Sequence, residues 1–308
     1  MAGQTKPDPW RFERIVLPGG LALRAAVAGK GPLVLMLHGF PESWYSWRHQ
    51  LRALSASYTC AAPELRGYGE SDAPRGVQNY TMEALAGDVR DLVLHFGRQH
   101  AVVIGHDWGG AIAWVASLMH PEVVERLVIL NCPHPLQMKR HLRSNFRQLT
   151  RSWYIFFFQL PCLPELMLRA GNFSLMMRAI REGAVRKEAF TDADLDHFRE
   201  ALSRPYALTA ALNYYRALAR RDLLFDPPAD HWLARKVQAP TLIIWGEQDI
   251  ALTKELTYGM EDLFAREFEI KYVPDSGHWV QQEKPDLVNR LLLDFLSGPA
   301  AATAGDSE

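Results

Sequence analysis

The chain has 308 residues, with 34 Lys and Arg against 35 Asp and Glu and a net charge of −1. This balance excludes a net field that would draw the chain to nucleic acid or an anionic membrane, and it suits a small neutral substrate better. With 48% hydrophobic and 22% charged residues, the composition excludes disordered, collagen-like and coiled-coil chains. At roughly 150 residues per domain, the length fits two domains or one large α/β domain with an insertion.

The cysteines and the first residues of the chain indicate the cellular compartment in which the protein is expected. Cys60, Cys132 and Cys162 are too few and too irregularly spaced for a disulfide framework or a zinc site, which favours a reducing compartment. Residues 1–12 contain two prolines and no apolar run of the kind found in signal peptides. No window approaches the ~20 apolar residues that span a bilayer. We therefore expect a soluble, cytoplasmic protein with no transmembrane segment.

In chain order, the first expected element is an antiparallel hairpin, with strands at 12–16 and 21–27 around Pro18-Gly19-Gly20. Short β-rich runs follow, and a helix is expected at 82–96 because apolar residues recur there at intervals of three and four. The expected strands are 33–37, 59–62, 101–105, 126–130, 241–245 and 268–273. This alternation is typical of a mainly parallel sheet.

Between residues 134 and 235 the pattern is helical and aromatic, without a convincing buried strand. We interpret it as a helical cap inserted between two parts of an α/β core, 1–133 and 236–298, followed by a disordered tail at 299–308. A helix lying on a membrane is the competing interpretation of the run Tyr154 to Phe158. Because that run is short and lacks a Lys-rich polar face, we favour cap core and pocket lining.

The sharpest motif is Gly105-His106-Asp107-Trp108-Gly109, between an apolar strand and a helical pattern at 110–119. It has the glycine spacing of a nucleophile elbow, a strand-to-helix turn that exposes its central side chain, here Asp107. Glycines are needed because so tight a turn leaves no room for neighbouring Cβ atoms. An Asp that only caps a helix is the alternative for this motif taken alone.

A second motif, His38-Gly39-Phe40-Pro41, directly follows the strand 33–37. A loop at this place supplies half of an oxyanion hole, so we expect the backbone N–H groups of Phe40 and Trp108 to converge on one oxygen. The alternative is a tight turn with a structural His38 and a cis Pro41. The two are compatible, since a rigid turn aims an amide.

Two more polar residues follow strands near the C-terminus: Asp249 ends the segment 245–249, and His278 lies in 276–279. The order Asp107, Asp249, His278 is that of a nucleophile, acid and histidine triad. All three follow the carboxyl ends of expected strands, where such sheets bind ligands. Asn131 holds the other position from which an acid could reach His278, but it cannot supply a charge, so we prefer Asp249.

Together these segments resemble the α/β-hydrolase superfamily and, within it, the epoxide hydrolases. The segments are 38–44 (HGFPESW), 66–71 (RGYGES), 105–110 (GHDWGG), 245–249 (WGEQD) and 277–279 (GHW). The resemblance extends over residues 12–296, closely in the core and more loosely in the cap, and Glu64 stands where relatives more often have Asp. It implies an α/β-hydrolase fold with a mostly parallel eight-stranded sheet, flanking helices and a helical cap.

The identity of the nucleophile constrains the reaction. A Ser that attacked saturated carbon would form an ether, which water does not readily cleave, whereas Asp107 forms an ester that can be hydrolysed. We expect His278, oriented by Asp249, to deprotonate the water, while the amides of Phe40 and Trp108 stabilise the oxyanion. An aspartate nucleophile therefore indicates alkyl transfer.

Opening an epoxide also needs proton donors for the departing oxygen. The resemblance implies two cap tyrosines, at positions matched by Tyr154 and Tyr215. Tyr214 competes with Tyr215, because adjacent residues on a helix point about 100° apart and only one can face the pocket. Aromatic packing within the cap is the alternative role for these side chains. To substrate binding we assign His38, Pro41, Trp279 and Phe157.

We therefore expect an epoxide hydrolase that adds water to a small lipophilic epoxide without a cofactor or a metal. A haloalkane dehalogenase with the same triad is the alternative, although such enzymes typically carry Asn where this chain has Phe40. An inactive binding protein on the same fold is a third hypothesis. No nucleic-acid partner is expected, and a homodimer is left open.

Overall fold

The computed structural model describes residues 8–220, 228 and 231–298, and its centre is one eight-stranded sheet of order β1-β2-β4-β3-β5-β6-β7-β8. The strands are β1 (Trp10–Val16), β2 (Ala22–Ala28), β3 (Leu33–Leu37), β4 (Thr59–Pro63), β5 (Ala101–His106), β6 (Val124–Leu130), β7 (Thr241–Gly246) and β8 (Phe268–Val273). The pairs β1/β2 and β2/β4 are antiparallel and all other neighbours are parallel. The predicted hairpin and mostly parallel sheet are confirmed, with strand ends shifted by one or two residues.

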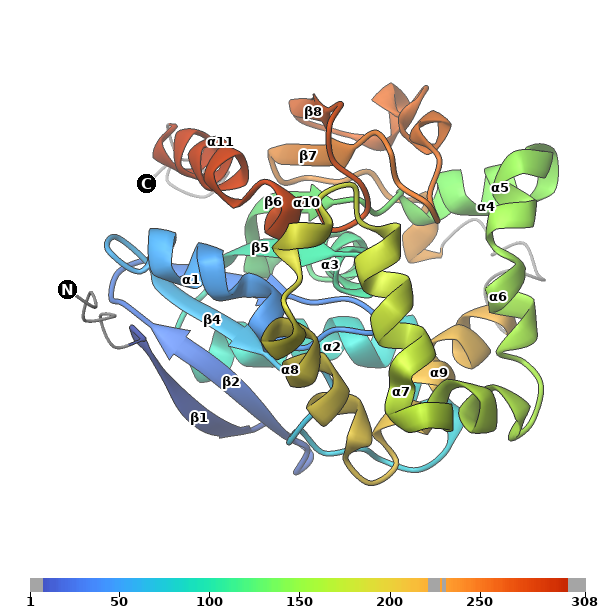
Figure 1. Cartoon of the computed structure of the whole chain (residues 1–308). Coiled ribbons are helices and arrows are strands. Elements are labelled where there is room, and N and C mark those ends of the chain that lie inside the picture. Colours follow the sequence, from blue (N-terminus) through green and yellow to red (C-terminus); the bar gives the residue numbers. More distant parts are fainter. Residues whose placement is uncertain (1–7, 221–227, 229–230, 299–308) are drawn as a thin grey trace, which may run out of the picture.

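Helices cover both faces of this sheet (Figure 1). They are α1 (Arg48–Leu54), α2 (Met82–His95), α3 (Trp108–Met119), α4 (Pro135–Ser144), α5 (Phe146–Arg151), α6 (Trp153–Phe157), α7 (Leu163–Gly183), α8 (Asp192–Ser203), α9 (Ala207–Leu218), α10 (Val280–Glu283) and α11 (Pro285–Ser297). Short 3₁₀ turns include η1 (Trp44–Trp47), η2 (Val77–Tyr80) and η6 (Trp232–Ala234). The predicted helix at 82–96 corresponds to α2.

Successive side chains along a strand point to opposite faces of the sheet, so the core has two layers. In β3, Leu35 packs with α2 and α3 on one face of the sheet, whereas its neighbour Met36 packs with α1 and α11 on the other. Both side chains are fully buried, as expected for parallel strands covered on both faces. The apolar runs in the sequence therefore encode the sheet directly.

Helices α4 to α9 lie between β6 and β7 in the chain and gather on one side of the molecule (Figure 1). The described part of 131–240 contains no strand. Helix α7 is interrupted at Ala170–Phe173, where the backbone is not helical. None of the helices described is long and apolar enough to cross a bilayer. The expected disordered tail, 299–308, lies outside the described residues.

Candidate active site

Asp107 lies in the sharp turn that joins β5 to α3, with φ 50° and ψ −119°. A non-glycine residue at positive φ costs about 1–3 kcal/mol and is typical of functional sites. Glycines allow the turn: a Cβ on Gly105 would lie 2.3 Å from the Gly109 carbonyl oxygen, and one on Gly109 would lie 2.0 Å from that of Leu37. The elbow therefore projects Asp107 at the carboxyl edge of the sheet.

The two carboxylate oxygens of Asp107 have different neighbours. Oδ1 accepts a hydrogen bond from the backbone N–H of Phe40 at 2.8 Å, and Oδ2 lies 3.6 Å from Nε2 of His278. Trp108 is the first residue of α3, where backbone N–H groups have no partner within the helix. Burial opposes ionisation of Asp107, but the interaction with His278 outweighs it and lowers the pKa of Asp107. Asp107 is therefore ionised at neutral pH.

His278 is held between two carboxylates. Its Nδ1 lies 2.7 Å from Oδ2 of Asp249, on the side away from Asp107. Burial alone would lower the pKa of His278, but the charges of Asp249 and Asp107 outweigh it and raise that pKa well above the usual value. The resting site therefore holds a protonated imidazole between two aspartates.

Asp249 is itself fixed by three hydrogen bonds besides that of His278. Its Oδ1 accepts from the backbone N–H groups of Ala251 at 2.7 Å and Leu252 at 2.8 Å. Its Oδ2 accepts from the side-chain amide of Asn131 at 2.8 Å. Asn131, rejected as the acid because it has no charge, thus supports the residue chosen in its place.

Sequence reasoning missed a second buried pair behind His278. Nδ1 of His106 lies 2.9 Å from Glu42 Oε2, and its Nε2 lies 2.8 Å from the backbone oxygen of His278. Both ring nitrogens of His106 therefore face oxygen partners, one on the Glu42 carboxylate and one on the backbone of His278. The available signal was a histidine at the end of an apolar buried strand, since a buried polar ring needs partners.

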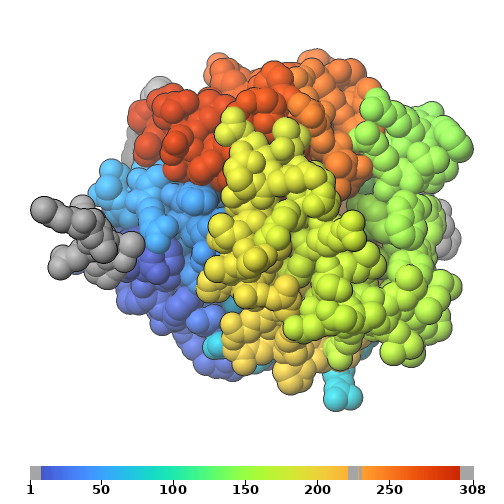
Figure 2. Space-filling model, viewed as in Figure 1, coloured from blue at the N-terminus to red at the C-terminus, as the bar shows by residue number. Residues whose placement is uncertain are grey.

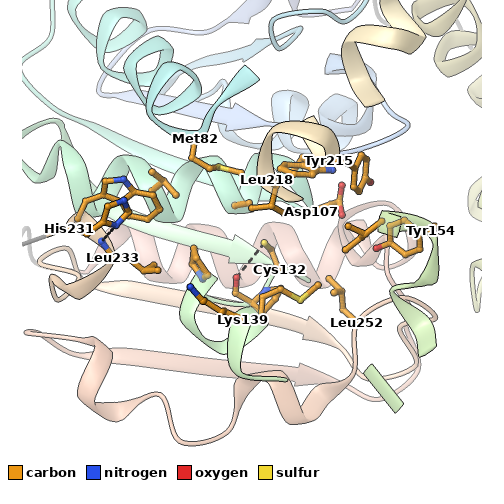
Figure 3. A pocket seen from close by; sticks show the side chains of 18 of the residues that line it. Met82, Asp107, Cys132, Lys139, Tyr154, Tyr215, Leu218, His231, Leu233 and Leu252 are labelled. Carbon is orange, nitrogen blue, oxygen red and sulfur yellow. Dashed lines mark hydrogen bonds between the residues drawn. The ribbon is translucent and has the colours of Figure 1, made fainter. Parts of the chain in front are cut away.

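Asp107, Tyr154 and Tyr215 line the same cavity, of about 440 Å³, and Figure 3 shows both tyrosines at the end of the cavity where Asp107 lies. The rings of Tyr154 and Tyr215 meet edge to face, with centroids 5.8 Å apart. Tyr214 points elsewhere: its hydroxyl donates to the Arg66 carbonyl oxygen at 2.7 Å. Of the two adjacent tyrosines, only Tyr215 lines the cavity.

From this polar end the cavity continues along mainly apolar walls. Figure 3 shows Asp107 at one end, with His231 and Leu233 at the other. The apolar lining includes Met82, Ala111, Val115, Cys132, Met138, Ile155, Leu218 and Leu252. A volume of this size falls in the range of small-molecule sites.

The four residues assigned to substrate binding do not line this cavity. Nε2 of His38 accepts from the backbone N–H of Leu65 at 3.1 Å, and burial lowers the pKa of His38 to about 4, so a neutral ring holds the turn. Pro41 follows a cis peptide bond. The Trp279 ring packs edge to face on Phe190.

The fourth, Phe157, packs on Trp153, with ring centroids 5.8 Å apart. The prediction that the run 154–158 is cap core and pocket lining is wrong for Phe156, which is 53% exposed. A five-residue helix turns successive side chains by about 100°, so Tyr154 and Ile155 reach the cavity while Phe156 faces outward.

Among the residues described, no group of three or more His, Cys, Asp or Glu could hold a metal ion.

Comparisons with known proteins agree with this fold. Residues 32–285 match the family model of the alpha/beta hydrolase fold. Human Epoxide hydrolase 4 is 38% identical over 283 residues, covering 90% of this chain and 76% of that protein. An AB hydrolase superfamily protein of Bacillus subtilis is 38% identical over 286 residues, covering 92% and 97%.

Among solved structures, an epoxide hydrolase of Bacillus megaterium in complex with an inhibitor has a TM-score of 0.84 at 30% identity, covering 92% of this chain and 99% of that one. The chain belongs to the α/β-hydrolase family. Within that family it belongs with the epoxide hydrolases.

Proposed function

We propose that this protein hydrolyses a lipophilic epoxide to a vicinal diol through a covalent ester on Asp107. The observation that carries the proposal is an ionised carboxylate at the elbow facing two phenols, Tyr154 and Tyr215, in one cavity. The names of the relatives support the same reaction class.

In the first step, Asp107 attacks one carbon of the epoxide. Because the Phe40 amide holds Oδ1, Oδ2 is the oxygen left to attack. The C–O bond of the ring breaks as the ester forms, and the departing oxygen takes a proton. Burial raises the pKa of both Tyr154 and Tyr215, so both phenols are protonated at neutral pH and can donate to that oxygen.

In the second step, water cleaves the ester with His278 as base. Esterification removes the negative charge of Asp107, one of the two charges that hold the pKa of His278 high. The pKa of His278 therefore falls once the ester exists, and the imidazole can lose its proton and accept one from water. The ester carbonyl oxygen is the former Oδ1, beside the Phe40 amide, and the start of α3 at Trp108 supplies the second donor.

The cavity supports the substrate class. Its walls leave room for an apolar group that extends from the epoxide at Asp107 toward Leu233, along side chains such as Met82 and Leu218. We propose that residues 134–235 act as the cap, because they contribute Tyr154 and Tyr215 above the elbow.

A single-turnover reaction in heavy-oxygen water tests the mechanism. With enzyme in excess over styrene oxide, the first diol should carry no label in its new hydroxyl, because that oxygen comes from Asp107, and the label should appear in the protein. Full labelling of the first diol would show direct attack by water and overturn the covalent route. A bromoalkane assayed beside the epoxide tests the dehalogenase alternative, and Asp107→Ala should abolish turnover of either.

A further inference from the structure

The outer side of α5 to α7 carries a row of exposed apolar side chains. The most exposed are Phe146 at 79%, Leu166 at 69% and Trp153 at 62%. We call this the apolar row; its members are Phe146, Leu149, Trp153, Phe156, Leu160, Leu163, Leu166 and Met167. Large contiguous apolar patches on soluble proteins commonly mark binding sites.

The row is a periodic feature of the cap. From Phe146 to Leu166 its members recur every three or four residues, the spacing of one helix face. The spacing continues although α5 and α6 are separated at Ser152 and residues 158–162 lie between α6 and α7. Residues on the opposite face, Ile155 and Phe158, are buried. Figure 2 shows this part of the chain, green to yellow-green, along the right-hand edge of the molecule.

The same part of the chain is strongly basic. Residues 134–178 contain seven Lys and Arg against one acidic residue, Glu165, although the whole chain has a net charge of −1. Arg140, Arg147, Arg169 and Arg178 are exposed. The near-neutral total therefore hides a cationic cap and a correspondingly acidic remainder.

We propose that the apolar row and its surrounding arginines dock this protein on the surface of an anionic phospholipid bilayer. Exposed Trp, Phe and Leu side chains enter the headgroup boundary, and basic residues are attracted to acidic lipids. A second copy of the chain fits less well, because pairing two such faces brings like charges together. The bilayer is contacted rather than crossed, since none of the helices described is long and apolar enough to span it.

Docking also places the membrane close to the cavity. Tyr154 and Ile155 of α6 line the cavity, while Trp153 and Phe156 of the same helix face outward. A bilayer on the apolar row is therefore one helix away from Asp107. If the proposed function holds, a lipophilic epoxide dissolved in the membrane reaches the site over a short path; the docking itself does not depend on catalysis.

A native cysteine provides the probe. Cys162 is exposed next to the apolar row, whereas Cys60 and Cys132 are buried, so an environment-sensitive thiol dye labels Cys162 selectively. Vesicles of phosphatidylcholine with phosphatidylglycerol should shift the dye emission to the blue and co-sediment the unlabelled protein. Vesicles of phosphatidylcholine alone, or 0.5 M salt, should largely abolish both effects.

Two variants separate the contributions. Trp153→Ser with Phe156→Ser should weaken binding about tenfold or more by removing apolar contact. Arg140→Gln with Arg169→Gln should weaken it about twenty-fivefold, at about fivefold per basic residue. The control is the double variant Val16→Ser with Leu94→Ser. Val16 and Leu94 are 60% and 54% exposed on β1 and α2, outside the apolar row, so this variant should bind vesicles as the parent does.

Absence of binding to anionic vesicles by the folded parent would overturn the proposal. An equal loss of vesicle binding in the control variant Val16→Ser with Leu94→Ser would also overturn it. Light scattering gives a further outcome. If the parent is a dimer, if Trp153→Ser with Phe156→Ser makes it a monomer, and if the parent does not bind vesicles, the row is a self-association surface instead. If the serine variants do not fold, as judged by circular dichroism, the arginine pair decides. None of these measurements uses an epoxide, so their failure is distinct from failure of the proposed reaction.

Discussion

His278 lies between Asp107 and Asp249, and the two proposed steps need opposite protonation states of its ring. A protonated His278 stabilises the ionised nucleophile, and the pair lowers one pKa while raising the other. The proposed ester would remove the charge of Asp107, one of the two charges that keep His278 protonated. The chemistry of the first step thereby prepares the base for the second.

Replacing His278 by Gln should permit alkylation and block hydrolysis, because glutamine cannot accept a proton from water. Intact-mass measurement should show the protein heavier by one substrate, and the adduct should persist. Asp249→Asn should slow the same step, because the ring loses the charge that orients it. Normal turnover by His278→Gln would contradict the division of labour, as would failure to gain the adduct.

Tyr154→Phe and Tyr215→Phe should each slow alkylation by an epoxide roughly ten- to a thousandfold, for a loss of ~1.4 to 4 kcal/mol of transition-state stabilisation. The double variant should be nearly inactive, and ester hydrolysis should change less, because its oxyanion lies at the amides. Stopped-flow measurement of the alkylation phase distinguishes the steps.

Tyr214→Phe is the matched control for the tyrosine variants. Its hydroxyl bonds to Arg66 away from the cavity, so it should cost stability and leave alkylation close to the parent rate. If the double Tyr154/Tyr215 variant alkylates at the parent rate, the tyrosines are packing residues and the epoxide assignment loses its main support.

At the scale of elements, the contact of α3 with β3 sets the position of the nucleophile. A Cβ on Gly109 would lie 2.0 Å from the Leu37 carbonyl oxygen, which is backbone of β3 and cannot move aside. Gly109→Ala should therefore push α3 away, lower the thermal midpoint and reduce turnover about a hundredfold or more.

Gly87→Ala in α2 is the control for the elbow variant. A Cβ there meets no atom within 4 Å, so the change should leave turnover intact and add about 0.5–1 kcal/mol of stability. The two midpoints by differential scanning fluorimetry should move in opposite directions. A Gly109→Ala protein with parent activity would contradict this account of the elbow.

At the scale of the whole molecule, a chain of buried polar side chains joins helix α8 to segments at the carboxyl edge of the sheet. Asp194 of α8 lies 3.2 Å from Arg48 and accepts from the Tyr45 hydroxyl at 3.1 Å. Arg48 donates to Gln282 at 2.6 Å, and Gln282 donates to Glu42, the partner of His106. Helix α8 is thereby linked to the residues behind His278.

Stability should depend on this link in a predictable pH range. Burial alone would raise the pKa of Asp194, but hydrogen bonding by Thr191 and the charge of Arg48 outweigh it and lower the pKa. A carboxyl group whose pKa is lowered by folding stabilises the protein at pH values above its pKa in the unfolded chain, which is about 4. That stabilisation is lost as the pH falls through the lower pKa of the folded state. Asp194→Asn should therefore lower the thermal midpoint at pH 7 by several degrees, and less so in acid.

Thermal unfolding of parent and variant between pH 3 and 7 checks this, with Asp192→Asn as control. Asp192 lies on the same helix, but its side chain is 91% exposed in its pair with Arg181, and exposed pairs contribute little. If the thermal midpoints of the parent and Asp194→Asn differ by the same amount at every pH, the stabilisation by Asp194 does not depend on its charge.

Much of this protein could be inferred from short stretches of sequence. A buried parallel strand such as β3 is a continuous apolar run, and an elbow needs glycines within two residues of Asp107, so both are written in adjacent positions. The order of Asp107, Asp249 and His278 is equally a property of the chain. Those features depend on local backbone geometry and on which residue follows which strand.

Other features appear only when distant segments pack. His106 meets Glu42 across 64 residues, Asn131 supports Asp249 across 118, and nothing near either residue in the chain specifies that partner. The choice of Tyr215 over Tyr214, and the outward direction of Trp153, likewise depend on which face of a helix meets the core. Sequence by itself determined the sheet, the elbow and the candidate reactive groups, because local chemistry encodes them; tertiary packing decided their partners, their exposure and their protonation, because those depend on neighbours that only folding brings together.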